Sequence, residues 1–170
     1  DPDSSLFRQL APEEVPATVN DLLAPQRPLV IVADGQAGLR EASRDLLKGL
    51  HWDYADIVDE NRIDPKGLIG RDLLFLGWPR RPELRPKLPA SLKINPADMP
   101  TWELPGNRRD GDALFAVIAG RHQQGTSSAV LLTHSPEAAR LIAAKVAHYG
   151  RYSLLLFQGG RSLVKTTWEP

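Results

Sequence analysis

Two short polar segments carry side chains suited to ligand binding where predicted strands end. Asp34, Gly35 and Gln36 directly follow one apolar run, and His134 and Ser135 lie in a turn after another. Free amides at the start of a helix bind anions, and open α/β sheets hold ligands at the carboxyl ends of their strands. The sequence therefore predicts that a small polar ligand, if one binds, contacts these five residues at one edge of the sheet.

The Asp34 loop lacks the glycine pattern of the known nucleotide-binding loops. Its sequence, Asp-Gly-Gln-Ala-Gly, has neither the third glycine of a dinucleotide-binding loop nor the Gly-Lys-Ser/Thr ending of a phosphate loop. The Asp34 carboxylate would also repel a phosphate group. An ordinary turn is the favoured interpretation of this loop, and no cofactor is predicted.

A hydrolase would use Ser135 as the nucleophile and His134 as its base, with Asp34 at the same edge of the sheet. The Gly-x-Ser-x-Gly pattern of a nucleophile on a sharp turn is missing. Ser135-Pro136-Glu137 is instead typical of a helix start, with a serine cap, a proline in the first turn and a carboxylate facing the helix dipole. We therefore assign Ser135 to capping and predict no catalytic residue.

Candidate metal ligands are present, but they lack the spacing of a binding site. An acidic cluster with one imidazole consists of His51, Asp53, Asp56, Asp59 and Glu60. Calcium loops need a tighter alternation and a glycine bend, so we interpret this cluster as a solvated loop. The other histidines, which lack the helical i, i+4 spacing of zinc ligands, are His122, His134 and His148. The chain has no cysteine, and we predict no metal site.

The overall composition narrows the range of partners. Of the 170 residues, 42% are hydrophobic, which is enough for one sizeable core, and 21 basic residues balance 21 acidic ones. A neutral chain has no overall field to attract nucleic acid, and no apolar run approaches the roughly 20 residues of a membrane-spanning helix. We therefore predict neither nucleic-acid binding nor membrane insertion. The start at Asp1, without an initiator methionine, indicates a fragment or a processed chain.

The chain divides into a lead-in segment and one domain. Prolines recur through residues 1–27 around a short amphipathic stretch at 19–23, so this segment is predicted to be a linker or a packed lead-in helix. Residues 28–170 are predicted to form a single α/β domain. Seven prolines between 79 and 105 exclude a long helix there and predict an irregular excursion.

Apolar runs and turn residues predict the order of strands and helices. The runs at 29–33 and 73–76 are typical of strands buried on both faces. Between them, a helical stripe consists of Leu39, Ala42, Leu46 and Leu50, followed by a polar connection over 51–70. This order predicts a parallel βαβ unit.

The second half of the chain predicts antiparallel pairing. The runs at 113–118 and 128–132 are spaced for an antiparallel pair, and a helix follows from 136 towards Gly150. Residues 154–157 and 162–168 predict a hairpin around a glycine pair. The whole pattern predicts a three-layer, flavodoxin-like or Rossmann-like α/β fold whose mixed sheet has parallel inner strands and an antiparallel C-terminal edge hairpin.

The C-terminal segment resembles a known group of proteins. His148-Tyr149-Gly150-Arg151-Tyr152-Ser153, the apolar run after it and residues 164–168 are similar to the tail domain of bacterial proteins related to zinc aminopeptidases of the membrane alanine aminopeptidase type. Residues 72–77 also resemble an upstream strand of those tails. The resemblance implies a module appended to an envelope-associated, periplasmic metallopeptidase. It transfers no zinc ligand or catalytic base, because the His-Glu-x-x-His motif of that family is absent here.

These observations predict a non-catalytic accessory domain. It would dock on a neighbouring domain of the same parent chain or shape substrate access to it. Trp78, Trp102 and Trp168 are expected either to cover the core or to mark the docking face, since aromatic side chains are enriched at interfaces. The alternative is a stand-alone module that binds a small ligand at the Asp34 and His134 edge.

Overall fold

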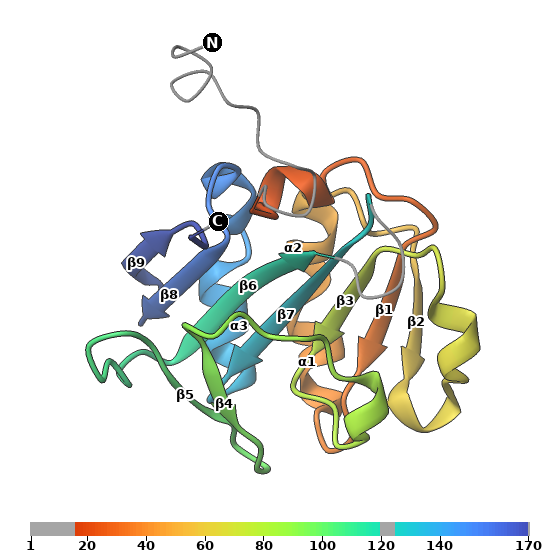
Figure 1. Ribbon diagram of the computed structural model, residues 1–170, viewed down its shortest axis with the longest axis horizontal. Coiled ribbons are helices and arrows are strands. Elements are labelled where there is room, and N and C mark those ends of the chain that lie inside the picture. The colour runs from red at the N-terminus through yellow and green to blue at the C-terminus, as the bar shows by residue number, and fades with distance from the viewer. Residues whose placement is uncertain (1–15, 120–124, 170) are drawn as a thin grey trace, which may run out of the picture.

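The computed structural model describes residues 16–119 and 125–169 and has one large sheet with helices behind it (Figure 1). His122 and residues 1–15 of the predicted lead-in segment lie outside the described ranges. Within that segment, Val19–Leu22 form the 3₁₀ helix η3, and the side chains of Val19 and Leu22 are fully buried. The end of the lead-in segment is therefore packed into the core.

The main sheet has seven strands in the order β2-β1-β3-β7-β6-β8-β9. In chain order the strands are β1 (Leu29–Val32), β2 (Asp56–Asp59), β3 (Leu73–Leu76), β6 (Ala113–Ala119), β7 (Ser127–Thr133), β8 (Leu154–Gln158) and β9 (Arg161–Thr166). β2, β1, β3 and β7 pair in parallel, whereas β6, β8 and β9 join by antiparallel pairing. The predicted mixed sheet with an antiparallel C-terminal hairpin is confirmed, and the prediction of parallel inner strands holds for β1 and β3 but not for β6 and β8.

The sheet is assembled from two continuous stretches of sequence. β1, β2 and β3 come from residues 29–76, and β6 to β9 come from residues 113–166. The parallel pair of β3 with β7 joins the two stretches and sets Leu73 opposite Ser128. Every residue of β1 and β3 is buried, as expected for strands that are covered on both faces.

The α-helices cover one face of the sheet. They are α1 (Ala37–Ala42), α2 (Arg44–Gly49) and α3 (Pro136–Ile142), together with the 3₁₀ helix η7 (Val146–Tyr149). The predicted stripe of leucines and alanine lies in this core, but Ser43 divides the predicted first helix into α1 and α2. Across the described ranges, every helix is too short or too polar to traverse a lipid bilayer.

The proline-rich excursion covers the opposite face. Its elements are the 3₁₀ helix η6 (Pro82–Leu84) and a two-stranded ribbon of β4 (Lys93–Asn95) and β5 (Thr101–Glu103). The 3₁₀ helices η4 (Glu60–Arg62) and η5 (Pro65–Leu68) precede it. Leu84, Leu92 and Trp102 are buried in the core on this face. Among the described residues no α-helix forms in the excursion, because its prolines remove backbone donors.

The connection predicted over residues 51–70 contains a strand, so that prediction is wrong in part. β2 pairs in parallel with β1 at the edge of the sheet. Ile57 and Val58 are half-buried, and they lie between the exposed residues Asp56 and Asp59. Two adjacent apolar residues are too short a run to indicate a strand from the sequence.

Of the two roles predicted for the three tryptophans, packing against the core is the one that the structure shows. Trp102 is 3% exposed and belongs to the core of the second face. Trp78 and Trp168 are partly buried against the same core, and the Trp168 indole donates a hydrogen bond to the carbonyl of Val117 at 2.7 Å. These tryptophans stabilise the fold, and none of them forms an exposed aromatic patch.

Candidate site at the carboxyl edge of the sheet

Four of the five predicted site residues line one small cavity. Gly35 and Gln36 follow β1, whereas His134 and Ser135 follow β7, and both segments lie at the carboxyl edge of the parallel strands. The cavity has a volume of about 190 Å³. Asp98 and Met99, from the turn between β4 and β5, also line it. The structure therefore brings these four residues together and adds Asp98 and Met99 from a distant segment that the sequence did not indicate.

Asp34, the fifth predicted residue, does not line this cavity. It lines a neighbouring cavity of about 300 Å³ between the ends of β1 and β2, together with Asp59 and Glu60. Its carboxylate accepts a hydrogen bond from the Arg80 guanidinium at 3.4 Å. Asp34 is therefore engaged in an ion pair with the segment that follows β3.

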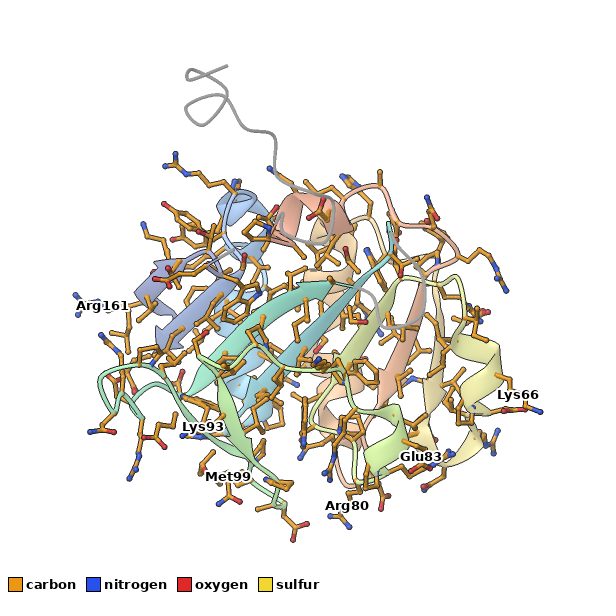
Figure 2. All side chains as sticks on the ribbon, in the orientation of Figure 1. Lys66, Arg80, Glu83, Lys93, Met99 and Arg161 are labelled. Carbon is orange, nitrogen blue, oxygen red and sulfur yellow. The ribbon has the colours of Figure 1, made fainter. Side chains whose placement is uncertain are left out.

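Arg80 ties the turn of the β4–β5 ribbon to the edge of the sheet. Its guanidinium contacts Asp34 and also the carboxylate of Asp98. Gln36 donates from its side-chain amide to the carbonyl of Asp98 at 2.9 Å. Figure 2 shows Arg80 and Met99 at the same edge of the molecule. Because Arg80 and Asp98 are largely exposed, each ion pair contributes at most about 1 kcal/mol.

The Glu60 carboxylate is the best-satisfied polar group at this edge. The residue is fully buried, and its carboxylate accepts hydrogen bonds from the backbone amides of Asp34 (2.6 Å), Arg80 (3.0 Å) and Arg81 (3.1 Å). The interpretation of Glu60 as part of a solvated loop is therefore wrong. Its partners lie 20 to 26 residues away in the chain, so no local pattern indicated this role.

Arg81 supports the same buried group. Its guanidinium donates to the carbonyls of Glu60 at 2.7 Å and Ile63 at 2.8 Å, which holds the η4 turn in place. It also donates to the Glu83 carboxylate at 2.8 Å, and that hydrogen bond holds the pKa of Glu83 below its usual range. Arg81 therefore holds the η4 turn against the segment that follows β3.

Glu60 occupies the place where open α/β sheets ordinarily bind ligands. The chain passes from β1 to β2 on one side and then crosses to β3 on the other, so the order of strands reverses between β1 and β3. The amides of Asp34 and Arg80 follow these two strands, and both donate to Glu60. These two amides are therefore already paired within the fold.

Ser135 and His134 do not form a catalytic pair. The Ser135 hydroxyl accepts a hydrogen bond from the Ala138 amide at 3.1 Å, which confirms the predicted cap of α3. The His134 ring stacks on Trp102, with 4.7 Å between ring centres. Its Nε2 atom is buried and has no hydrogen-bond partner among the described residues, so the imidazole does not activate the hydroxyl.

Replacing Ser135 tests the capping assignment. We expect Ser135→Ala to lower the free energy of unfolding by about 1 kcal/mol, because the Ala138 amide loses its acceptor. Ser135→Asp keeps a capping oxygen and should retain the stability. Urea unfolding followed by circular dichroism measures both changes. An esterase activity of the unmodified domain that Ser135→Ala removes would instead make this residue a nucleophile.

Within residues 16–119 and 125–169, the acidic and imidazole side chains nowhere form a group of three or more able to hold a metal ion. The cluster from His51 to Glu60 is dispersed, because Glu60 points into the fold while Asp56 and Asp59 are exposed on β2.

Comparison of this chain with protein-family models and with curated proteins found no match in either set.

Proposed function

We propose that this chain is a non-catalytic accessory domain of a larger, envelope-associated protein related to zinc aminopeptidases. The observation that carries the proposal is the buried Glu60 carboxylate, which accepts hydrogen bonds from three backbone amides at the reversal of strand order. Ser135, Asp34 and Gln36 are also engaged by other parts of the fold. The polar groups of this domain hold its own loops together instead of lining an active site. This arrangement suits a non-catalytic domain that binds a neighbouring domain.

The residues of the C-terminal resemblance support an architectural role. Gly150 packs so tightly against the lead-in segment that a Cβ atom there would lie 2.0 Å from the side-chain oxygen of Asn20. The backbone amide of Asn20 donates a hydrogen bond to the Gly150 carbonyl at 2.7 Å. Tyr149 and Tyr152 pack edge to face, with ring centres 6.4 Å apart. These contacts hold η3, η7 and the C-terminal hairpin together, which is a structural role.

A flavodoxin-like relationship of the parallel half is part of the proposal. When only the strands that pair in parallel are counted, the order β2-β1-β3-β7 is that of the first four strands of a flavodoxin-like sheet. The antiparallel strands β6, β8 and β9 would then be an elaboration of that sheet. Fold alone does not define function, so this relationship supports only the choice of edge for ligand tests.

The alternative function is binding of a small polar ligand in the 190 Å³ cavity. It is favoured by the unpartnered Nε2 atom of His134, one of the lining residues. Thermal unfolding with nucleotides, dicarboxylates, amino acids and sugars separates the two functions. We expect no rise in Tm for the accessory domain. A saturable rise that Gln36→Ala abolishes would replace the accessory proposal with the ligand-binding one.

The accessory proposal is tested directly by the coding sequence around this segment. We expect it to encode a His-Glu-x-x-His helix upstream, within the same reading frame. A second measurement is hydrogen exchange of the longer protein compared with the domain alone, which should show amides protected only in the longer protein. A reading frame that holds only these residues would contradict the proposal.

A further inference from the structure

The C-terminal part of the chain departs from the overall charge balance. Residues 143–168 contain no aspartate or glutamate, although acidic and basic residues are equal in number over the whole chain. The basic residues of this stretch are Lys145, Arg151, Arg161 and Lys165. None of them forms an ion pair with any described residue. Uncompensated cations on one part of a neutral protein attract an anionic partner.

Three of these cations lie on or beside the last strand of the sheet. β9 carries Arg161 and Lys165, and the Arg151 guanidinium lies 5.4 Å from the ring centre of Tyr152. β9 pairs with β8 on one side, and within the described ranges no strand lies on its other side (Figure 1). Exposed backbone groups on an edge strand provide a template for pairing with another chain.

Lysine on an edge strand ordinarily keeps other strands away, but Lys165 is held to one side. Its ammonium lies 5.2 Å from the ring centre of Tyr149 and 6.0 Å from that of Tyr152. Both tyrosines pack against the core on the α-helical face of the sheet. The positive charge therefore stays close to β9 while the side chain leans over the helical face.

The chemistry of the surface favours a peptide over a nucleic acid. Single-stranded nucleic acids bind by stacking bases on free aromatic rings. Tyr149 and Tyr152 are partly buried, pack against each other and have cations over their rings. Between its two basic residues β9 presents Leu163, which is 36% exposed, and the partly buried Val164. Cationic side chains flank an apolar pair on this open edge, which suits an extended chain with apolar and acidic residues.

We propose that β9 is the docking edge of this domain and pairs with an extended acidic segment of a partner protein. The carboxylates of that segment would meet Arg161, Lys165 and Arg151. This inference rests on the proposed function, because it names the surface through which an accessory domain would bind its neighbour.

Titration of the ¹⁵N-labelled domain with a synthetic peptide of alternating glutamate and valine tests the proposal. We expect saturable shifts of the backbone amides of residues 161–166, with binding weakened by salt. Arg161→Glu should weaken binding about tenfold, since it places a like charge against the peptide. Lys66→Glu makes the same charge change at the opposite end of the molecule, as Figure 2 shows, and should leave binding unchanged.

Two further probes separate strand pairing from simple charge attraction. A peptide of the same sequence with methylated backbone nitrogens keeps its carboxylates but cannot form a strand ladder, so we expect it not to bind. Equal binding of this peptide would overturn the docking-edge proposal. Tighter binding of oligothymidylate or of anionic lipid vesicles at β9 would also overturn it, as would the absence of any shift at β9. The reading-frame and ligand tests judge the accessory function independently of these outcomes.

Discussion

Glu60→Ala is expected to lower the free energy of unfolding by about 3–5 kcal/mol, because it leaves three backbone amides without their buried acceptor. The same carboxylate joins the loops after β1 and β3 to the end of β2. Its loss therefore loosens three segments of the carboxyl edge together. Chemical denaturation measures the loss, and hydrogen exchange should show faster exchange at Asp34, Arg80 and Arg81.

Two variants make the Glu60 prediction specific. Glu60→Gln keeps one acceptor but turns an amide group towards a backbone donor, so it should recover only part of the stability. Glu41→Ala removes an exposed carboxylate from α1 and should change the stability by no more than about 0.5 kcal/mol. A loss of less than about 1 kcal/mol in Glu60→Ala would show that this carboxylate does not hold the edge together.

Asp72 lies at the opposite end of the same strands, and Asp72→Ala is expected to lower the free energy of unfolding by about 2–4 kcal/mol. Asp72 is 3% exposed, and its carboxylate accepts hydrogen bonds from the backbone amides of Gln26 at 2.6 Å and Ser127 at 2.7 Å. It therefore ties the segment before β1 and the start of β7 to β3. Removing it leaves the buried backbone amide of Ser127 and the partly buried backbone amide of Gln26 unpaired where the two halves of the sheet meet.

Urea unfolding of Asp72→Ala and Asp72→Asn measures this effect. The asparagine retains one acceptor oxygen, so we expect a loss between those of the alanine variant and the unmodified protein. Asp53→Ala, at an exposed position before β2, is the matched control and should be nearly neutral. Equal stability of the two alanine variants would contradict the role of Asp72.

Elements defined by neighbouring residues were predicted from the sequence. β1 and β3 are continuous apolar runs, and the cap of α3 depends on Ser135 and a backbone amide three residues away. The meeting of Gln36 with His134 was also predicted, because the carboxyl ends of parallel strands share one edge. These features need no knowledge of distant contacts.

Features that depend on distant partners were not predicted. The burial of Glu60 follows from contacts with residues beyond β3, and which of its two predicted roles Trp102 has follows from how the excursion folds back over the sheet. Asp98 and Met99 reach the cavity from the same excursion, whose prolines indicated only irregular structure. The sequence predicted where the edge lies, but the groups that fill it are brought there by tertiary packing.

The division of the sheet into two continuous halves has a consequence for how the chain folds. Strand partners within each half are at most 44 residues apart, as for Leu29 and Leu73. β3 and β7 meet across 55 residues, the largest separation between paired strands in the sheet. Contacts of such high contact order form late, since loop closure must precede them. Until they form, two strands that are buried along their whole length in the folded protein have open edges. The interval before the halves dock is therefore when newly made chains are most prone to aggregate.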